Sequence, residues 1–170
     1  MLGYVMADRR GEVDALLLRL GQGLLAGGWP LSGVVQMNRE LRAGRACDMD
    51  LQVLGYDHVV RISQDLGPHA RGCRLDTAAL ERAVGLVDGA LERAPALLII
   101  NKFGKSEAEG RGFRDVIGRA LSNGVPVLTG VASAHLDAFL AFSDGMAEPV
   151  APELVALQDW CMKVCAARQD

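Results

Sequence analysis

The chain has few aromatic residues and almost no excess of charge. Aromatic residues are 5% of the 170 residues, and the formal net charge is −3. A chain so near neutrality lacks the basic field that draws proteins to nucleic acid, so we expect no nucleic-acid partner. No apolar run reaches the roughly 20 residues that cross a bilayer, and the first residues carry no basic leader. We therefore expect a cytoplasmic protein without membrane insertion.

Cysteines are also few, and their spacing is uninformative. Cys47, Cys73, Cys161 and Cys165 form no C-x-x-C pair, so in the reducing cytosol we expect free thiols. The segment 47–50 joins a thiol to two carboxylates, but neighbouring residues of a strand face opposite ways and no histidine is near. We assign no metal site.

Short apolar runs alternate with stretches of 3.6-residue period, which is typical of βαβ units and a parallel sheet. The pattern predicts one α/β domain over residues 1–170, with a mostly parallel sheet and helices on both faces. The expected strands are 2–6, 31–36, 58–63, 96–101 and 125–131, with 48–54 as a further strand open to an antiparallel direction. The expected helices begin near 13, 77 and 113, with a short one around 135–142 and a terminal one from about 152.

Ligands of open parallel sheets bind beyond the carboxyl ends of the strands. The first such loop, 7–11, lies where a phosphate-binding P-loop would lie. A working P-loop ends in Gly-Lys-Ser/Thr, whereas here Gly11 is followed by Glu12 and Val13. Only Gly11 is kept, so we interpret Asp8, Arg9, Arg10 and Gly11 as a degenerate phosphate loop. Whether Arg9 and Arg10 supply positive charge or form a solvated turn stays open.

The strand expected at 96–101 resembles a Walker B strand, which normally leads to an acid that holds magnesium. Here Asn101 and Lys102 stand at its end. Replacing two acids by an amide and a lysine favours holding an anion over holding a cation.

Residues 61–74 include three arginines and few apolar side chains that a core could bury. Arginine presents a fork of donors that suits phosphate, carboxylate or a similar oxyanion. The alternative is a solvated loop whose arginines pair with nearby aspartates. On the first interpretation the predicted oxyanion-binding residues are Arg61, Ser63, Gln64, Arg71, Gly72, Arg74, Asn101, Lys102 and Lys105.

Several motifs together resemble an uncharacterised bacterial family often encoded beside molybdate-transport genes. They are Leu2–Met6, Cys47–Asp50, Arg61–Gly67, Arg71–Asp76 and Asn101–Lys105. More distantly, Asn101–Glu107 is similar to the Asp-Glu-Ile-Gly-Lys-Met-Glu signature of THEP-type nucleoside triphosphatases. In that comparison Asn101 stands at the magnesium aspartate and Lys102 at the catalytic glutamate, while Gly104, Lys105 and Glu107 are kept. The resemblance implies a degenerate P-loop NTPase-like fold.

Two functions follow from this resemblance. The first is a cytosolic oxyanion-binding protein that stores, buffers or delivers molybdate or tungstate, with molybdenum-transport or cofactor-assembly proteins as partners. The second is a nucleotide-dependent phosphohydrolase or transferase, or a nucleotide-binding regulatory subunit without turnover. Loss of the Walker acids disfavours an active NTPase. The sequence leaves a homo-oligomer open.

Overall fold

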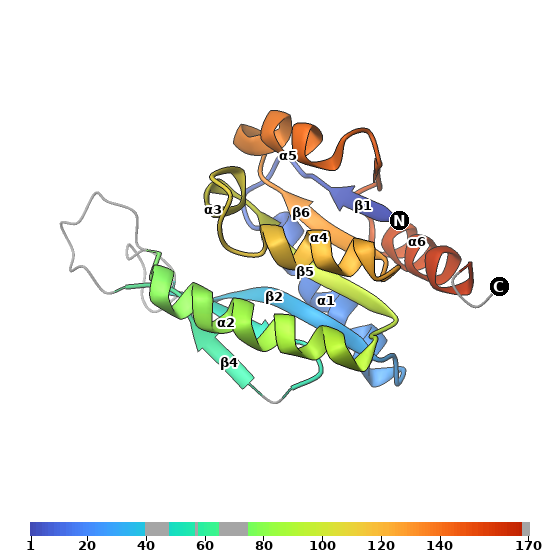
Figure 1. Ribbon diagram of the computed structural model, residues 1–170, viewed down its shortest axis with the longest axis horizontal. Helices are drawn as coiled ribbons and strands as arrows, with labels where there is room; N and C mark the ends of the chain where they lie inside the picture. The colour runs from blue at the N-terminus through green and yellow to red at the C-terminus, as the bar shows by residue number, and fades with distance from the viewer. Residues whose placement is uncertain (40–47, 57, 65–74, 168–170) are drawn as a thin grey trace.

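A computed structural model gives the fold, and it describes residues 1–39, 48–56, 58–64 and 75–167. The strands and helices alternate along most of the chain (Figure 1). Their bounds are β1 Leu2–Val5, α1 Glu12–Ala26, β2 Leu31–Arg39, β3 Asp48–Val53, β4 His58–Arg61, α2 Thr77–Ala90, η1 Leu91–Arg93, β5 Leu97–Phe103, α3 Lys105–Ala108, α4 Arg114–Ser122, β6 Val127–Val131, η2 Ser133–His135, α5 Leu136–Ser143, β7 Ala147–Pro149 and α6 Leu154–Ala166.

The strands form one seven-stranded sheet in the order β4-β3-β2-β5-β6-β1-β7. The five strands from β2 to β7 in this order pair in parallel. β3 pairs antiparallel with both β2 and β4, so β4 runs in the same direction as β2. The carboxyl ends of β1, β2, β4, β5 and β6 therefore meet at one edge of the sheet.

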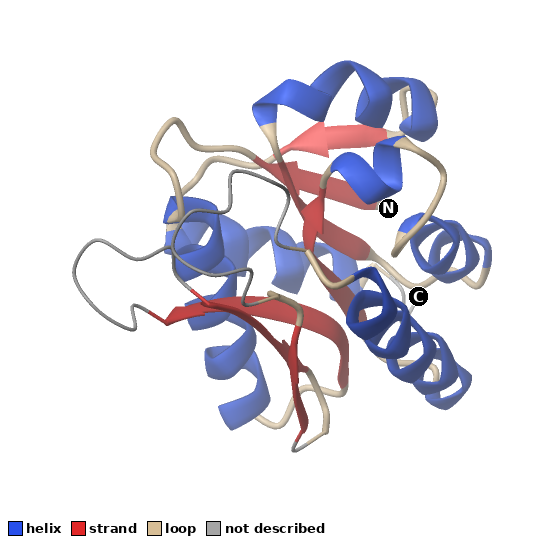
Figure 2. Ribbon diagram, turned by 90° about the vertical axis from the view of Figure 1, so that its left-hand side faces the viewer, coloured by secondary structure: helices blue, strands red, loops and turns tan. Residues whose placement is uncertain are grey.

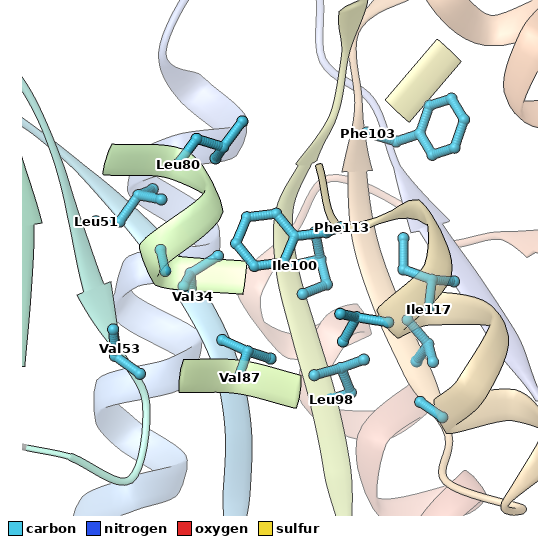
Figure 3. Close-up of a cluster of buried hydrophobic side chains, with 14 of the residues drawn as sticks. Val34, Leu51, Val53, Leu80, Val87, Leu98, Ile100, Phe103, Phe113 and Ile117 are labelled. Carbon is cyan, nitrogen blue, oxygen red and sulfur yellow. The ribbon is translucent and has the colours of Figure 1, made fainter. Parts of the chain in front are cut away.

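Helices cover both faces of this sheet, as Figures 1 and 2 show. α1 and α6 pack on one face against Val5, Val35, Ile99 and Leu128. α2 and α4 pack on the other face, where buried side chains of β2, β3 and β5 meet those of the helices (Figure 3). The predicted α/β class, with its mostly parallel sheet and two helical layers, is confirmed.

The ends of the helices follow local sequence signals. Asp76 caps α2 by accepting a hydrogen bond from the Ala79 N–H at 2.9 Å. Gly27 ends α1, and Asn123 ends α4. Gly11 precedes α1 with a φ of 81°, a left-handed conformation that glycine adopts without strain. The short elements α3 and β7, of four and three residues, have too few residues for a periodic pattern and were not predicted.

Candidate functional site

A buried carboxylate lies where α1 begins, at the carboxyl edge of the sheet. Asp14 is 4% exposed. Its Oδ2 atom accepts a hydrogen bond from Asn38 Nδ2 at 2.9 Å and a longer one from Gln36 Nε2 at 3.5 Å. Its Oδ1 atom lies 3.4 Å from Lys102 Nζ. Asp14, Gln36, Asn38 and Lys102 form a polar group, which we call the Asp14 cluster, and it joins α1 to the ends of β2 and β5.

An irregularity in β5 positions Lys102 and its neighbour. The pairing of β5 with β6 shifts between Ile100 and Phe103, so β5 holds one more residue there than β6. A bulge of this kind changes the direction in which side chains leave a strand, and bulges occur often beside functional sites. Asn101 and Lys102, joined by a cis peptide bond, are the two residues within it.

A cavity of about 240 Å³ lies beside these two residues, and we call it the Asn101 cavity. Its apolar lining comes from β3, α2 and the residues that flank β4, α2 and α4. These apolar residues are Met49, Leu51, Ile62, Leu75, Leu80 and Phe113. Figure 3 shows Leu51, Leu80 and Phe113 among the buried side chains where α2 packs on the sheet. The polar residues of the lining are Gln36, Asn101, Lys102, Lys105, Ser106 and Glu107.

Asn101 is the unusual residue of this cavity. It is 3% exposed, and neither its Nδ2 nor its Oδ1 atom has a hydrogen-bond partner among the described residues. A buried polar group without a partner costs roughly 1–3 kcal/mol, so native proteins rarely keep one without a reason. Asn101 therefore keeps two donors and an acceptor without described partners beside the cavity.

Glu107 holds the loop that closes one side of the cavity. Its two carboxylate oxygens accept hydrogen bonds from the N–H groups of Gly104 and Phe113, at 2.9 and 3.0 Å. Burial raises the pKa of Glu107 above its ordinary value of 4.5, and the two backbone hydrogen bonds oppose that rise. Because both oxygens accept hydrogen bonds from the backbone, the role of Glu107 is to fix the conformation of the loop 104–113.

The predicted residues of the 61–74 segment either do not line the cavity or lie outside the described residues. Arg61 binds Asp50 across β3 and β4, with 3.1 Å between Nε and Oδ1. Ser63 Oγ accepts a hydrogen bond from the Met49 N–H at 3.1 Å, and Gln64 is exposed. Arg71, Gly72 and Arg74 lie outside the described residues.

The structure thus brings together only part of the predicted site. Asn101, Lys102 and Lys105 line one cavity, whereas Arg61, Ser63 and Gln64 do not. Lys105 is mostly exposed, and its Nζ lies 3.8 Å from Glu109 Oε1. The assignment of an oxyanion to these residues stays a prediction.

The whole-chain comparison decides the family. Residues 2–160 match the family described as "Protein of unknown function (DUF2478)". The chain belongs to this family. It is also 34% identical, over 151 residues, to a protein of Bradyrhizobium diazoefficiens named "Molybdenum import ATP-binding protein ModC 2". The aligned region covers 88% of this chain and 17% of that protein, so most of the relative lies outside the match. No solved structure matches the chain significantly.

The fold of this DUF2478 protein is P-loop NTPase-like, and the loop 7–11 takes the P-loop's place between β1 and α1. Asp8, Arg9 and Arg10 are exposed there, and a turn brings the Glu12 N–H within 3.2 Å of the Arg9 oxygen. A side chain at Gly11 would come within 3.9 Å of Asn38 Nδ2. The loop therefore lies next to the Asp14 cluster.

Asp14 was missed by the sequence analysis, although a signal for it exists. The buried residues of α1 include Asp14, Leu17, Gly21 and Leu24, which share one helical face. A carboxylate in the apolar stripe of a helix requires partners, since charged groups are rarely buried alone.

Two classes of site or segment are absent from the described part of the chain. No described helix has the length and apolar content that spanning a bilayer requires. Residues 1–39, 48–56, 58–64 and 75–167 also hold no group of three or more His, Cys, Asp or Glu side chains placed to share a metal ion.

Proposed function

We propose that this protein binds an oxyanion at the carboxyl edge of its sheet and serves molybdenum handling, with molybdate or tungstate as its ligand. The observation that carries the proposal is the unsatisfied Asn101 amide beside Lys102 in one cavity. Asn101 offers two N–H donors, and Lys102 offers a positive charge and further N–H donors. Lys105 adds a second cation at the solvent side of the cavity.

Charge at this edge supports an anion in preference to a magnesium ion. Working P-loop enzymes hold magnesium with a hydroxyl after the P-loop lysine and with an acid after the Walker B strand. In this chain the corresponding places hold Val13 and Asn101, and Lys102 follows. Three described acids are buried near this edge, and each has partners. Asp14 is bound by Lys102 and two amides, Asp50 by Arg61, and Glu107 by two backbone N–H groups.

The relative gives the ligand its identity in this proposal. A protein named for molybdenum import contains a segment 34% identical to nearly the whole of this chain. Segments carried in one polypeptide commonly serve one process, so we propose storage, buffering or delivery of the metalate, with molybdenum-transport proteins as partners.

The nucleotide-dependent enzyme is the second candidate, and the P-loop NTPase-like fold favours it. We expect negligible ATP hydrolysis, because Glu12 stands where the P-loop lysine would contact the phosphates, and Asn101 and Lys102 stand where acids would hold magnesium and activate water. Phosphate release measured with ATP and magnesium tests this expectation. Turnover near ~1 per second, a typical kinase rate, would establish the enzyme instead.

Calorimetric titration with molybdate, tungstate, sulfate and phosphate, without magnesium, tests the proposal. In Lys102→Ala we expect metalate binding to weaken by about 2 kcal/mol, roughly 30-fold, the size expected when one partner of a partly desolvated charge pair is removed. Lys102→Glu should abolish binding. The matched control is Lys163→Ala, an exposed lysine on α6. Equal affinities in wild type, Lys102→Ala and Lys163→Ala would refute the oxyanion site.

A further inference from the structure

An inorganic oxyanion would satisfy only half of Asn101. Its Nδ2 donors fit an oxyanion, but its Oδ1 atom is an acceptor and is equally buried without a described partner. Fully ionised molybdate, tungstate or sulfate has no proton to donate to that oxygen. The ligand that completes Asn101 must carry a donor and an acceptor side by side.

The walls of the Asn101 cavity are also unlike those of a site for a bare ion. Leu51 and Phe113 are each 1% exposed, and Ile62 and Leu80 add further apolar surface. Apolar walls offer no hydrogen bonds to replace those that an ion makes with water, so entry of a bare ion is unfavourable. They do favour the flat face of an organic ring, whose removal from water is favourable.

The size of the cavity limits how much of a ligand it can hold. Sites for drug-sized ligands span roughly 300–1,000 Å³. A cavity of about 240 Å³ therefore accepts a ring and leaves the rest of the molecule outside. At its solvent side lie Lys102, whose side chain is 39% exposed, and Lys105, whose side chain is 73% exposed. Both lysines are placed to meet a negative charge attached to the ring.

The geometry points to an organic anion of nucleotide type as a ligand of this site: a nucleobase-like heterocycle inside the cavity and its phosphate at the two lysines. Asn101 pairs with an edge of the ring that presents adjacent donor and acceptor atoms, as asparagine does with adenine in protein–DNA complexes. This inference rests on the same site as the proposed oxyanion function. It differs in the ligand, whose anionic group is attached to an organic ring. It places the base between α2 and β5, with the phosphate at the mouth of the cavity.

The test compares ligands that differ only in the base. The full chain is titrated calorimetrically, without magnesium, with AMP, GMP and ribose 5-phosphate. We expect AMP or GMP to bind at least tenfold more tightly than ribose 5-phosphate. In Asn101→Leu, which keeps the branched shape and removes the amide, that advantage should fall below about threefold, because the base loses its paired edge. Asn123→Leu, at the exposed end of α4, is the control that keeps the advantage.

Stability of the free protein supplies a second measurement. Removing a buried amide that lacks partners should raise the urea midpoint of Asn101→Leu, or leave it unchanged. If Asn101→Leu does not fold, Asn101→Ala replaces it in the titrations.

Each outcome bears on one proposal or the other. Equal affinity for AMP, GMP and ribose 5-phosphate, or a base advantage that survives in Asn101→Leu, overturns the nucleobase inference. Molybdate binding that depends on Lys102, with no advantage from a base, overturns it while the oxyanion function stands. A base advantage with no molybdate binding leaves the inference in place and refutes the metalate.

Discussion

The substitution Asp14→Asn tests the proposed site, because the ammonium group of Lys102 would contact both Asp14 and a bound anion. Asparagine keeps the size of aspartate and removes its negative charge. Asp14 Oδ1 lies 3.4 Å from Lys102 Nζ, and a bound anion would contact the same ammonium group. The carboxylate therefore competes with the ligand for the lysine and also repels the ligand directly.

The size of this repulsion follows from the geometry. An oxygen of the anion about 3 Å beyond Lys102 Nζ lies ~6 Å from the carboxylate, where repulsion is ~0.7 kcal/mol per ligand charge in water and ~2.8 kcal/mol at an effective dielectric constant near 20. Lys102 is partly exposed, so the lower part of this range applies. For a dianion this gives about 1.4–3 kcal/mol, so Asp14→Asn should bind molybdate at least tenfold more tightly.

The same change should make the fold less stable. Hydrogen bonds to charged groups contribute about 1.5–3 kcal/mol and neutral ones about 0.5–1.5 kcal/mol, so losing the charge should cost about 1 kcal/mol of unfolding free energy. Isothermal titration gives the affinity, and urea unfolding gives the stability. Asp159→Asn, an exposed carboxylate on α6, controls for net charge. Unchanged or weaker molybdate binding in Asp14→Asn would refute the view that Lys102 carries the ligand's charge.

Three other predictions concern groups that the fold itself constrains. Because burial raises the pKa of Glu107 in the folded protein, the unfolded chain gives up this proton at lower pH, so folding should lose stability as pH rises from about 4.5 through the raised pKa. Glu107→Gln should remove that component from urea titrations across pH. It should also cost ~1–3 kcal/mol at neutral pH, because its amide N–H would face a backbone N–H; exposed Glu109→Gln should do neither. Gly33 has a φ of 118°, and an added Cβ would lie 1.8 Å from the Ile99 oxygen, so Gly33→Ala should cost more than about 3 kcal/mol in urea unfolding. Gly85→Ala, in the middle of α2 with nothing within 4 Å of an added Cβ, should instead gain about 0.5–1 kcal/mol; similar effects of the two changes would contradict the packing at β2. Burial raises the pKa of Cys161 to about 12, so iodoacetamide should modify this thiol at pH 8 only when the protein unfolds, as peptide mass spectrometry can measure. Rapid alkylation of Cys161 in the native protein would contradict its burial on the inner face of α6.

The sequence by itself determined the class of fold. Apolar runs at 31–36 and 96–101 became the central strands β2 and β5, because a strand buried on both faces must be apolar throughout. The antiparallel option for 48–54 was also confirmed by β3. Asp76 begins α2 and Gly27 ends α1, and such caps are legible in the sequence because capping depends on residues adjacent in the chain.

The sequence also singled out Asn101 and Lys102, because the expected acids are missing from a recognisable strand end. It did not reveal that Asp14, 88 positions earlier, holds Lys102. Nor did it reveal that Arg61 turns to Asp50 while its neighbour Ile62 lines the cavity. Each of these depends on which segments meet at the edge of the sheet, and local pattern carries no information about such contacts.

Only the tertiary structure decided the character of the site. Leu51, Leu80 and Phe113 belong to three separate segments and are ordinary core residues in the sequence, yet together they wall one cavity. The bulge in β5 sets Asn101 in that cavity, where no described residue satisfies its amide. A polar residue becomes informative when the folded chain buries it and leaves its hydrogen bonds unmade, because water is removed there by packing between distant segments.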